Sequence, residues 1–279
     1  MQHQMISMNP DRAVTLEVCG FSLPNPDEPT PTLEHPRPAI IICPGGGYEF
    51  LSEREADPVA IAFERFGFQC FVLRYSIREH ATFPQPVVDA ARAVRWVRAH
   101  AVELGVDPER VAVLGFSAGG HVTAMLGTMH QQDDVVQAER EEYAQLADRG
   151  VQANAGLMEF PSRPNAIVPC YAVMAADWMD LPFPKETIMA TDCIRAAGPH
   201  VPPAFVWTTG EDTLVPPTQS LRFVTALSEH GVPFEYHHYA HGPHGLSLGD
   251  SLTNFGQSVP ENAYTWVKLC ARWLRAVMG

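Results

Sequence analysis

The sequence predicts an α/β fold in which helices cover both faces of a mostly parallel central sheet. Short, continuous apolar runs recur along the chain, as is typical of parallel strands that are buried on both faces. Amphipathic stretches long enough for helices separate these runs, which is typical of right-handed crossover connections. With 279 residues, of which 46% are hydrophobic and 18% charged, the chain can bury a substantial core.

The expected strands and helices alternate in order from residue 39. The apolar run AIIIC predicts a strand at 39–43, and a helix follows at 58–66. The run FQCFVLRY predicts a second strand at 68–75, before a long amphipathic helix at 87–104. These four elements form two successive strand–helix units.

The second half of the chain continues the pattern. Asp107 and Pro108 predict a turn that leads into a strand at 111–114, because both residue types favour turns. A helix is expected at 121–129. The remaining expected strands are 166–171, 204–208 and 234–239, and the remaining expected helices are 220–229 and 261–277.

Two segments depart from this alternation. Residues 22–38 are rich in proline and predict an extended connection. Residues 131–165 are acidic at first and then rich in Asn, Gly and Pro, and Val136, Tyr143 and Ala147 could share one helical face. We treat residues 1–279 as one domain, in which 131–165 is either a solvated surface insertion or a lid over the functional site.

Charge and composition exclude several classes of partner. A net charge of −13 argues against nucleic acid and against an anionic membrane surface. The sequence shows no basic segment followed by an apolar run and no apolar stretch of about 18 residues, so we expect neither a secretory signal nor a membrane span. The six cysteines lack CxxC pairs and are expected to be reduced. We therefore expect a cytoplasmic protein that acts on a small molecule, as a monomer or a homo-oligomer.

The segment Gly115-Phe116-Ser117-Ala118-Gly119 joins an expected strand to an expected helix. A serine hydroxyl is a weak nucleophile at neutral pH and must project toward a base. A tight strand-to-helix turn exposes Ser117 in this way, and glycines at 115 and 119 avoid side-chain crowding. The motif predicts a nucleophilic serine.

A nucleophilic serine in such a sheet needs an acid and then a histidine later in the chain. Asp212 follows the strand at 204–208 and is the expected acid; the alternatives are Glu211, Asp177 and Asp180. Four histidines crowd together near the end of the last strand: His237, His238, His241 and His244. His237 and His238 are neighbours within that strand and should point to opposite faces. His244, in the segment GPHG, is the expected base, and His241 is the alternative.

A metal site is the rival interpretation of these histidines. Their spacing, H-H-x-x-H-x-x-H, matches no zinc motif, so we expect no metal and no organic cofactor.

The segment Pro44-Gly45-Gly46-Gly47-Tyr48 follows the first expected strand. Consecutive glycines allow backbone N–H groups to approach a ligand closely. We therefore expect the N–H groups of Gly46, Gly47 and Ala118 to form an oxyanion hole. Tyr48 and Phe50 are candidates for the wall of the substrate pocket, with core packing as the alternative.

These segments resemble the α/β-hydrolase superfamily, in particular the bacterial esterase/lipase group that includes acetyl esterases and acetylxylan esterases. The resemblance is carried by PGGGYEFLSERE, LRYS, DPERVAVLGFSAGGHVTAML, TTGEDTLVPPTQS and GVPFEYHHYAHGPHGLSLG, which span most of the chain from residue 38 onward. It implies an α/β-hydrolase fold with a catalytic triad of Ser117, Asp212 and His244.

The same resemblance implies a serine carboxylesterase that hydrolyses short acyl esters, with acetyl groups on carbohydrate as the expected substrates. The chain departs from the group in its longer, more acidic segment 131–165, and it has Pro44 where hormone-sensitive lipase-like esterases carry histidine. The alternatives are another activity on this fold (a lactonase, a dienelactone hydrolase or a peptidase) and a non-catalytic binding protein.

Overall fold

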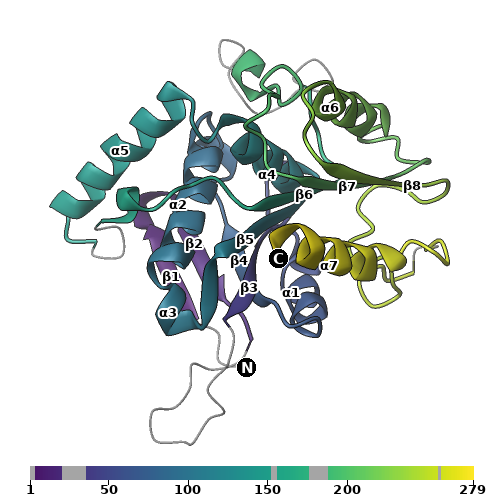
Figure 1. Ribbon diagram of the computed structural model, residues 1–279, viewed down its shortest axis with the longest axis horizontal. Coiled ribbons are helices and arrows are strands. Elements are labelled where there is room, and N and C mark those ends of the chain that lie inside the picture. The colour runs from purple at the N-terminus through teal and green to yellow at the C-terminus, as the bar shows by residue number, and fades with distance from the viewer. Residues whose placement is uncertain (1–3, 21–35, 152–155, 176–187, 257–258) are drawn as a thin grey trace, which may run out of the picture.

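The computed structural model describes residues 4–20, 36–151, 156–175, 188–256 and 259–279. At its centre lies an eight-stranded sheet with the strand order β1-β2-β4-β3-β5-β6-β7-β8 (Figure 1). The strands are β1 (Gln4–Asn9), β2 (Val14–Val18), β3 (Arg37–Cys43), β4 (Gln69–Arg74), β5 (Val106–Phe116), β6 (Ala166–Cys170), β7 (Ala204–Thr209) and β8 (Phe234–Tyr239). All pairs from β4 to β8 are parallel, which confirms the predicted mostly parallel sheet.

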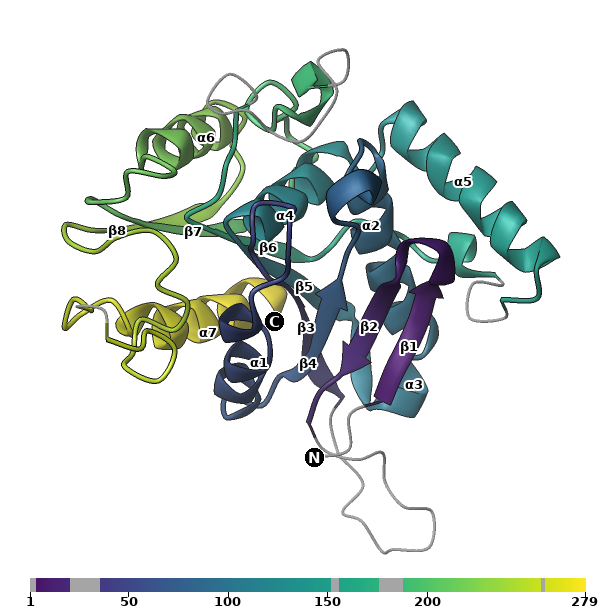
Figure 2. The same cartoon turned by 180° about the vertical axis from the view of Figure 1, so that it is seen from behind.

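The sequence did not predict β1 and β2, which form an antiparallel hairpin and join the sheet beside β4 (Figure 2). The first four residues of β1 are exposed or half-buried. Edge strands of this kind lack the continuous apolar run of a buried parallel strand, and that run was the signal used for the other six.

Strand β5 begins at Val106, so the prediction of a turn at Asp107 and Pro108 is wrong. Arg37 of β3 pairs with Val106 and Ala39 with Val111, so the residues between Val106 and Val111 form an irregularity within one strand. The Asp107 carboxylate accepts the Glu109 N–H at 2.9 Å, which is a turn-like interaction inside a bulged strand.

Helices cover both faces of the sheet, as predicted (Figures 1 and 2). One face carries α1 (Asp57–Glu64) and α7 (Thr265–Met278), and the other carries α2 (Gln85–Ala99), α4 (Ala118–Met129) and α6 (Thr218–Glu229). The helix expected at 87–104 divides at His100 into α2 and the short α3 (Ala101–Leu104). The described 3-10 helices are η1 (Pro10–Arg12), η2 (Glu53–Glu55), η3 (Arg78–His80), η5 (Leu157–Glu159) and η6 (Ile188–Thr191).

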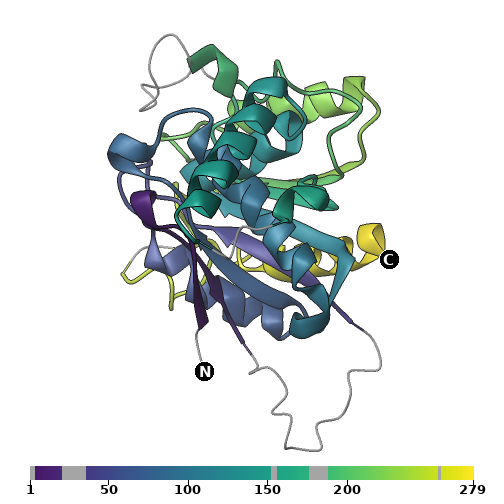
Figure 3. The same ribbon diagram turned by 90° about the vertical axis from the view of Figure 1, so that its left-hand side faces the viewer.

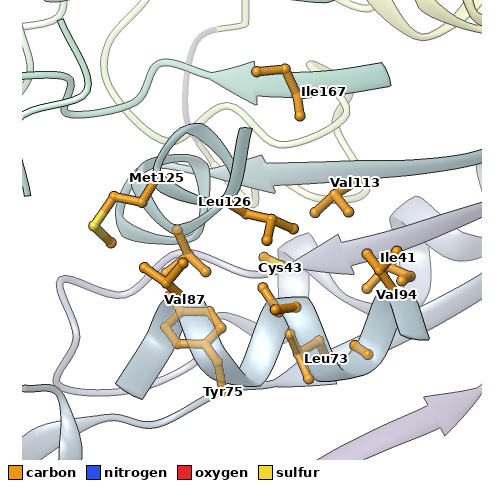
Figure 4. Packing of buried hydrophobic residues seen from close by; sticks show 14 of the residues in the cluster. Ile41, Cys43, Leu73, Tyr75, Val87, Val94, Val113, Met125, Leu126 and Ile167 are labelled. Atoms are coloured by element: carbon orange, nitrogen blue, oxygen red, sulfur yellow. The ribbon is translucent and has the colours of Figure 1, made fainter. Parts of the chain in front are cut away.

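Two layers of buried side chains hold the helices to the sheet. Because side chains alternate along a strand, Ile41 faces the α2 and α4 side, whereas Ile40 and Ile42 face α1 and α7. Figure 4 shows the first layer, with Val87 and Val94 of α2 and Met125 and Leu126 of α4 beside strand residues such as Ile41, Val113 and Ile167. This packing holds the ends of β3, β5, β7 and β8, from which the functional loops emerge.

The segment 131–165 contributes α5 (Asp133–Asp148), which packs against α2 on the outside of the molecule (Figures 1 and 3). Its buried residues are Val135, Glu139, Tyr143 and Leu146. Tyr143 is buried as expected, but Val136 is half-buried and Ala147 is exposed, so the expected face is only partly correct. Ion pairs explain the difference: Glu139 pairs with Arg95 of α2 at 2.8 Å, and Glu142 pairs with Arg12 at 2.7 Å.

Most of the proline-rich connection at 22–38, and residues 152–155 of the acidic segment, lie outside the described residues. In the part of the chain that the structure describes, no helix is both long enough and apolar enough to cross a membrane.

Candidate active site

Ser117 occupies a sharp turn between β5 and α4. Its backbone angles are φ 52° and ψ −116°, a positive-φ conformation that costs a non-glycine residue roughly 1–3 kcal/mol. Its N–H donates to the Cys170 carbonyl at 3.0 Å, which anchors the turn to the end of β6. A Cβ at position 119 would lie 2.0 Å from the Cys43 carbonyl oxygen, and one at position 115 would lie 2.1 Å from the Gly119 oxygen. Only glycine therefore fits on either side of this turn.

The structure brings Ser117, His244 and Asp212 together from three different loops. His244 Nε2 lies 2.8 Å from Ser117 Oγ, and His244 Nδ1 lies 2.7 Å from Asp212 Oδ2. Because a carboxylate can only accept, Nδ1 carries the proton and Nε2 is left to accept the serine proton. The arrangement can activate a hydroxyl nucleophile.

The carboxylate of Asp212 is held in a single orientation. Its Oδ1 accepts the N–H groups of Leu214 at 3.0 Å and Val215 at 2.8 Å, while Oδ2 faces His244. The residue is only 4% exposed. A buried carboxylate with three donors is well suited to orient an imidazole and to stabilise its protonated form.

The alternative acid and the alternative base contact each other instead. Glu211 lies 3.1 Å from His241 Nδ1 and accepts the Gly242 N–H at 2.8 Å. The Gly242 N–H is the main cause that lowers the pKa of Glu211. Both side chains are exposed, and the structure shows neither bonded to Ser117.

The other two clustered histidines have separate partners. His237 Nε2 lies 2.7 Å from Glu235, and His238 Nδ1 lies 3.2 Å from the Thr208 hydroxyl. Within the described ranges, no group of three or more His, Cys, Asp or Glu side chains is arranged to hold a metal ion. Asp177 and Asp180, the remaining alternative acids, lie outside the described residues.

The glycine-rich loop after β3 lies directly beside Ser117. A Cβ at position 45 would come within 3.0 Å of the Ser117 Cβ, so the two backbones are in close contact. Gly46 has φ 134° and Gly47 has φ 62°, conformations that favour glycine. The Gly46 carbonyl accepts the N–H groups of Glu49 and Phe50 at 3.0 and 3.2 Å, which closes the loop into a tight turn.

A cavity of about 550 Å³ opens above Ser117 and His244. Gly46, Gly47 and Ala118 line it beside the serine. The described residues that line it are Gly46, Gly47, Tyr48, Glu49, Phe50, Ser52, Arg54, Glu55, Ser117, Ala118, Val173, Leu214, Val215, His244 and Gly245. No described residue from 131–165 is among them, and α5 packs on α2.

The two candidate pocket residues have different environments. Phe50 is 58% exposed and borders the cavity, as does Leu214, which is 55% exposed. Tyr48 also borders the cavity, but it is only 1% exposed and its hydroxyl lies 2.9 Å from His121 Nδ1. The ring of Tyr48 is therefore part of the core, whereas Phe50 is available to a bound molecule.

Glu55 was not among the residues expected at the site, yet it lies in η2 and borders the cavity. It is 3% exposed, and its burial raises the pKa of the carboxyl group. The available signal was the segment SERE, in which two acidic residues and one arginine follow the glycine-rich loop closely. Charged residues near a loop are usually solvated, and the sequence does not show which of them is buried.

Comparisons with known proteins show which family and fold this chain resembles. The BD-FAE family model matches residues 29–227, more than half of the chain. The crystal structure of MGS-M1, an α/β-hydrolase enzyme from a deep-sea metagenome library, is 33% identical, with a TM-score of 0.76 over 100% of this chain and 98% of that one. An acetyl ester-xyloside bifunctional hydrolase from Caldicellulosiruptor lactoaceticus is 28% identical, with a TM-score of 0.75 over 98% of this chain and 96% of that one.

Curated relatives are longer than this chain. An acetylxylan esterase from Xylanibacter ruminicola is 27% identical over 246 residues, which cover 82% of this chain and 45% of that protein. For the first three curated relatives, the match likewise spans between 33% and 46% of the relative's own length.

Proposed function

The chain belongs to the BD-FAE family within the α/β-hydrolase superfamily, and on that premise we propose that it is a serine carboxylesterase acting on short-chain acyl esters. The observation that carries the proposal is the continuous hydrogen-bonded series from Asp212 through His244 to Ser117, at 2.7 and 2.8 Å. The serine of this series borders a cavity large enough for a small ester.

In the proposed mechanism, Ser117 Oγ attacks the ester carbonyl while His244 Nε2 takes the serine proton. Asp212 stabilises the resulting imidazolium through Nδ1–H. The tetrahedral intermediate then expels the alcohol, which receives the proton from His244, and an acyl-enzyme remains on Ser117. Water attacks the acyl group, with His244 again acting as the base, and releases the carboxylic acid and free Ser117.

The negative charge that develops on the carbonyl oxygen needs hydrogen-bond donors. We assign this role to the N–H groups of Gly46, Gly47 and Ala118, which border the cavity beside Ser117. A single donor of this kind typically contributes roughly 2.7–4 kcal/mol of transition-state stabilisation.

We further propose that the natural substrates are acetyl groups on carbohydrate. Support comes from the acetylxylan esterase of Xylanibacter ruminicola and from the acetyl ester-xyloside hydrolase of Caldicellulosiruptor lactoaceticus. The exposed ring of Phe50 at the cavity mouth offers a flat apolar surface against which a sugar ring could pack. The rival functions are a lactonase, a dienelactone hydrolase or a peptidase on the same fold, and a ligand-binding protein without catalysis.

The first test is hydrolysis of p-nitrophenyl esters from acetate to octanoate, together with acetate release from acetylated xylo-oligosaccharides. Ser117→Ala is the test variant, and Ser228→Ala, at the exposed end of α6, is the matched control. We expect acetate to be the best ester and only the Ser117 variant to lose turnover. A preference for octanoate would replace the carbohydrate proposal with lipid-like esters. Equal turnover in wild type and Ser117→Ala would refute the serine mechanism.

A fluorophosphonate probe separates the esterase from a binding protein. Such probes form a covalent bond with an activated serine, so wild type should be labelled and Ser117→Ala should not. A binding protein that retains the fold would remain unlabelled.

A further inference from the structure

We propose that Glu55 and Tyr171 form a positioning pair that holds the oxyanion loop and the histidine loop in place around Ser117. The oxyanion loop is residues 44–48, and the histidine loop is residues 242–247. The inference rests on the proposed function, because both loops matter only if Ser117 is acylated. Neither residue is part of the triad or among the proposed oxyanion donors.

Glu55 contacts the oxyanion loop directly. Its Oε2 accepts the Gly45 N–H at 2.8 Å, and its Oε1 accepts the Tyr171 O–H at 2.6 Å. Both donors are neutral, and among the described residues no cation lies within ion-pair distance of Glu55. Burial raises the pKa of Glu55 despite the opposing charges of His244 and Arg54. A buried carboxylate without a paired cation costs several kcal/mol of desolvation. A carboxylate with so large a cost stabilises the fold poorly, which points to a role at the site.

Tyr171 continues the connection to the histidine loop. Its hydroxyl accepts the Ser247 N–H at 2.9 Å, three residues beyond His244. Its ring lies 5.1 Å from the ring of His244, at an interplanar angle of 73°. The four groups Gly45, Glu55, Tyr171 and Ser247 therefore form one continuous series of hydrogen bonds between the two loops.

Backbone strain concentrates at the same series. Tyr171 has φ 36° and Ser247 has φ 49°, both in the left-handed region that non-glycine residues rarely adopt. Each such residue costs roughly 1–3 kcal/mol and persists only where the surrounding contacts hold it. Here the Ser247 hydroxyl donates to the Arg54 carbonyl at 2.6 Å, next to Glu55, and the Tyr171 hydroxyl is bonded on both sides. Strain held by a buried network is typical of a functional site.

Arg54 reinforces the same connection from the neighbouring position. Its Nη2 donates to the Gly245 carbonyl at 3.2 Å and its Nη1 to the Thr253 carbonyl at 2.6 Å. Residues 54 and 55 together therefore contact the oxyanion loop on one side and the histidine loop on the other.

Two conservative variants break the series at different points. In Glu55→Gln, the amide offers one acceptor where Gly45 and Tyr171 present two donors, so one of these two donors loses its acceptor. In Tyr171→Phe, the ring beside His244 remains, but Glu55 loses a donor and the Ser247 N–H loses its acceptor. Glu53→Gln is the matched control, because Glu53 lies on the same 3-10 helix and pairs with Arg74 at the surface.

The experiment measures kcat and KM for p-nitrophenyl acetate in these variants and in the double variant Glu55→Gln/Tyr171→Phe. Active sites are counted by fluorophosphonate titration, and the Tm of each protein is recorded. Because misplacement of catalytic groups by about 1 Å can cost 10²-fold, we expect kcat per active site to fall roughly 10- to 100-fold in each single variant. We expect KM to stay within about threefold, since these groups do not bind the ester.

The double variant tests whether the two residues act as a unit. Because both substitutions break one series, the double variant should lose about as much kcat as the worse single variant, rather than the product of the two losses. Multiplicative losses would overturn the pairing.

The outcomes separate this inference from the proposed function. If wild type is not labelled at Ser117 and shows no Ser117-dependent turnover, the esterase proposal fails. If wild type is active but Glu55→Gln and Tyr171→Phe match Glu53→Gln in kcat per active site, only the positioning pair is refuted. A lower Tm with unchanged kcat per site would also refute it. Should Glu55→Gln not fold, Tyr171→Phe decides by the same criteria.

Discussion

Replacement of Asp212 by asparagine should nearly abolish turnover without a change of shape. The N–H groups of Leu214 and Val215 both donate to Oδ1, so the single amide oxygen of Asp212→Asn must occupy that position. The amide NH₂ then faces His244 Nδ1, where it can only donate. His244 is thereby trapped with its proton on Nε2, which faces Ser117 Oγ and can no longer accept the serine proton.

The magnitude follows from the loss of the base. The equivalent tautomer change in a Ser-His-Asp triad lowers kcat by about 10⁴-fold. This corresponds to about 5 kcal/mol of transition-state stabilisation. The folded state should change little, since asparagine keeps the two backbone contacts and the volume of the aspartate.

The assay is steady-state hydrolysis of p-nitrophenyl acetate, with circular dichroism to verify the fold. Glu211→Gln is the matched control, because Glu211 is the neighbouring carboxylate and contacts His241 and the Gly242 N–H. We expect its kcat to remain within about fivefold of wild type, as the lost interactions are exposed. A folded Asp212→Asn that retains a tenth or more of the wild-type kcat would refute the assignment of the acid, as would an equal loss in both variants.

Three further perturbations test other parts of the structure. Burial lowers the pKa of His121 from its usual value of 6.5 to about 4. Keeping this histidine neutral therefore adds to the free energy of unfolding in full above pH 6.5, and this contribution is lost as the pH falls toward 4. Between pH 7 and 5, urea unfolding should therefore show wild type losing about 2 kcal/mol more stability than His121→Gln, and parallel losses would contradict the buried neutral histidine. Gly119→Ala should lower Tm by more than about 8 °C, against about 4 °C or less for Gly150→Ala, because a Cβ at 119 meets the Cys43 carbonyl and one at 150 meets nothing within 4 Å. Equal Tm values would contradict the tight turn. Phe50→Ala should raise KM by up to about tenfold with little change in kcat or Tm, whereas Phe255→Ala, exposed and outside the cavity lining, should leave KM unchanged. An unchanged KM in Phe50→Ala would remove Phe50 from the substrate site.

The buried parallel strands were predictable because their signal is local. Strands β3 to β7 each carry a continuous apolar run, and in β3, which pairs with β4 and β5, all residues from 39 to 43 are buried. Strand β8 is more exposed. The hairpin β1–β2 lacked that signal, since its burial depends on the neighbour β4 rather than on its own composition. The buried face of α5 was predicted only in part, for a related reason. Glu139 is buried only because Arg95 of α2 pairs with it, and a sequence pattern treats glutamate as exposed.

The serine turn was also predictable from sequence. Gly115 is required by its close contact with the backbone of Gly119, and Gly119 by its contact with Cys43 on the adjacent strand. Because both glycines lie two residues from Ser117, the requirement is visible as a sequence motif. Asp212 and His244 were expected from their positions after two strands. Glu211 and His241 follow the same strands and could not be excluded on that ground.

The sequence by itself determined the parallel strands of the sheet, the serine turn and the glycine-rich loop, because these depend on local backbone geometry and on runs of apolar residues. Only the tertiary structure decided which carboxylate meets which histidine: Asp212 faces His244 at 2.7 Å, while Glu211 faces His241 at 3.1 Å. It also decided that Glu55 is buried between two loops far apart in the chain. Side-chain direction and burial depend on packing between segments remote in sequence, which no local pattern records.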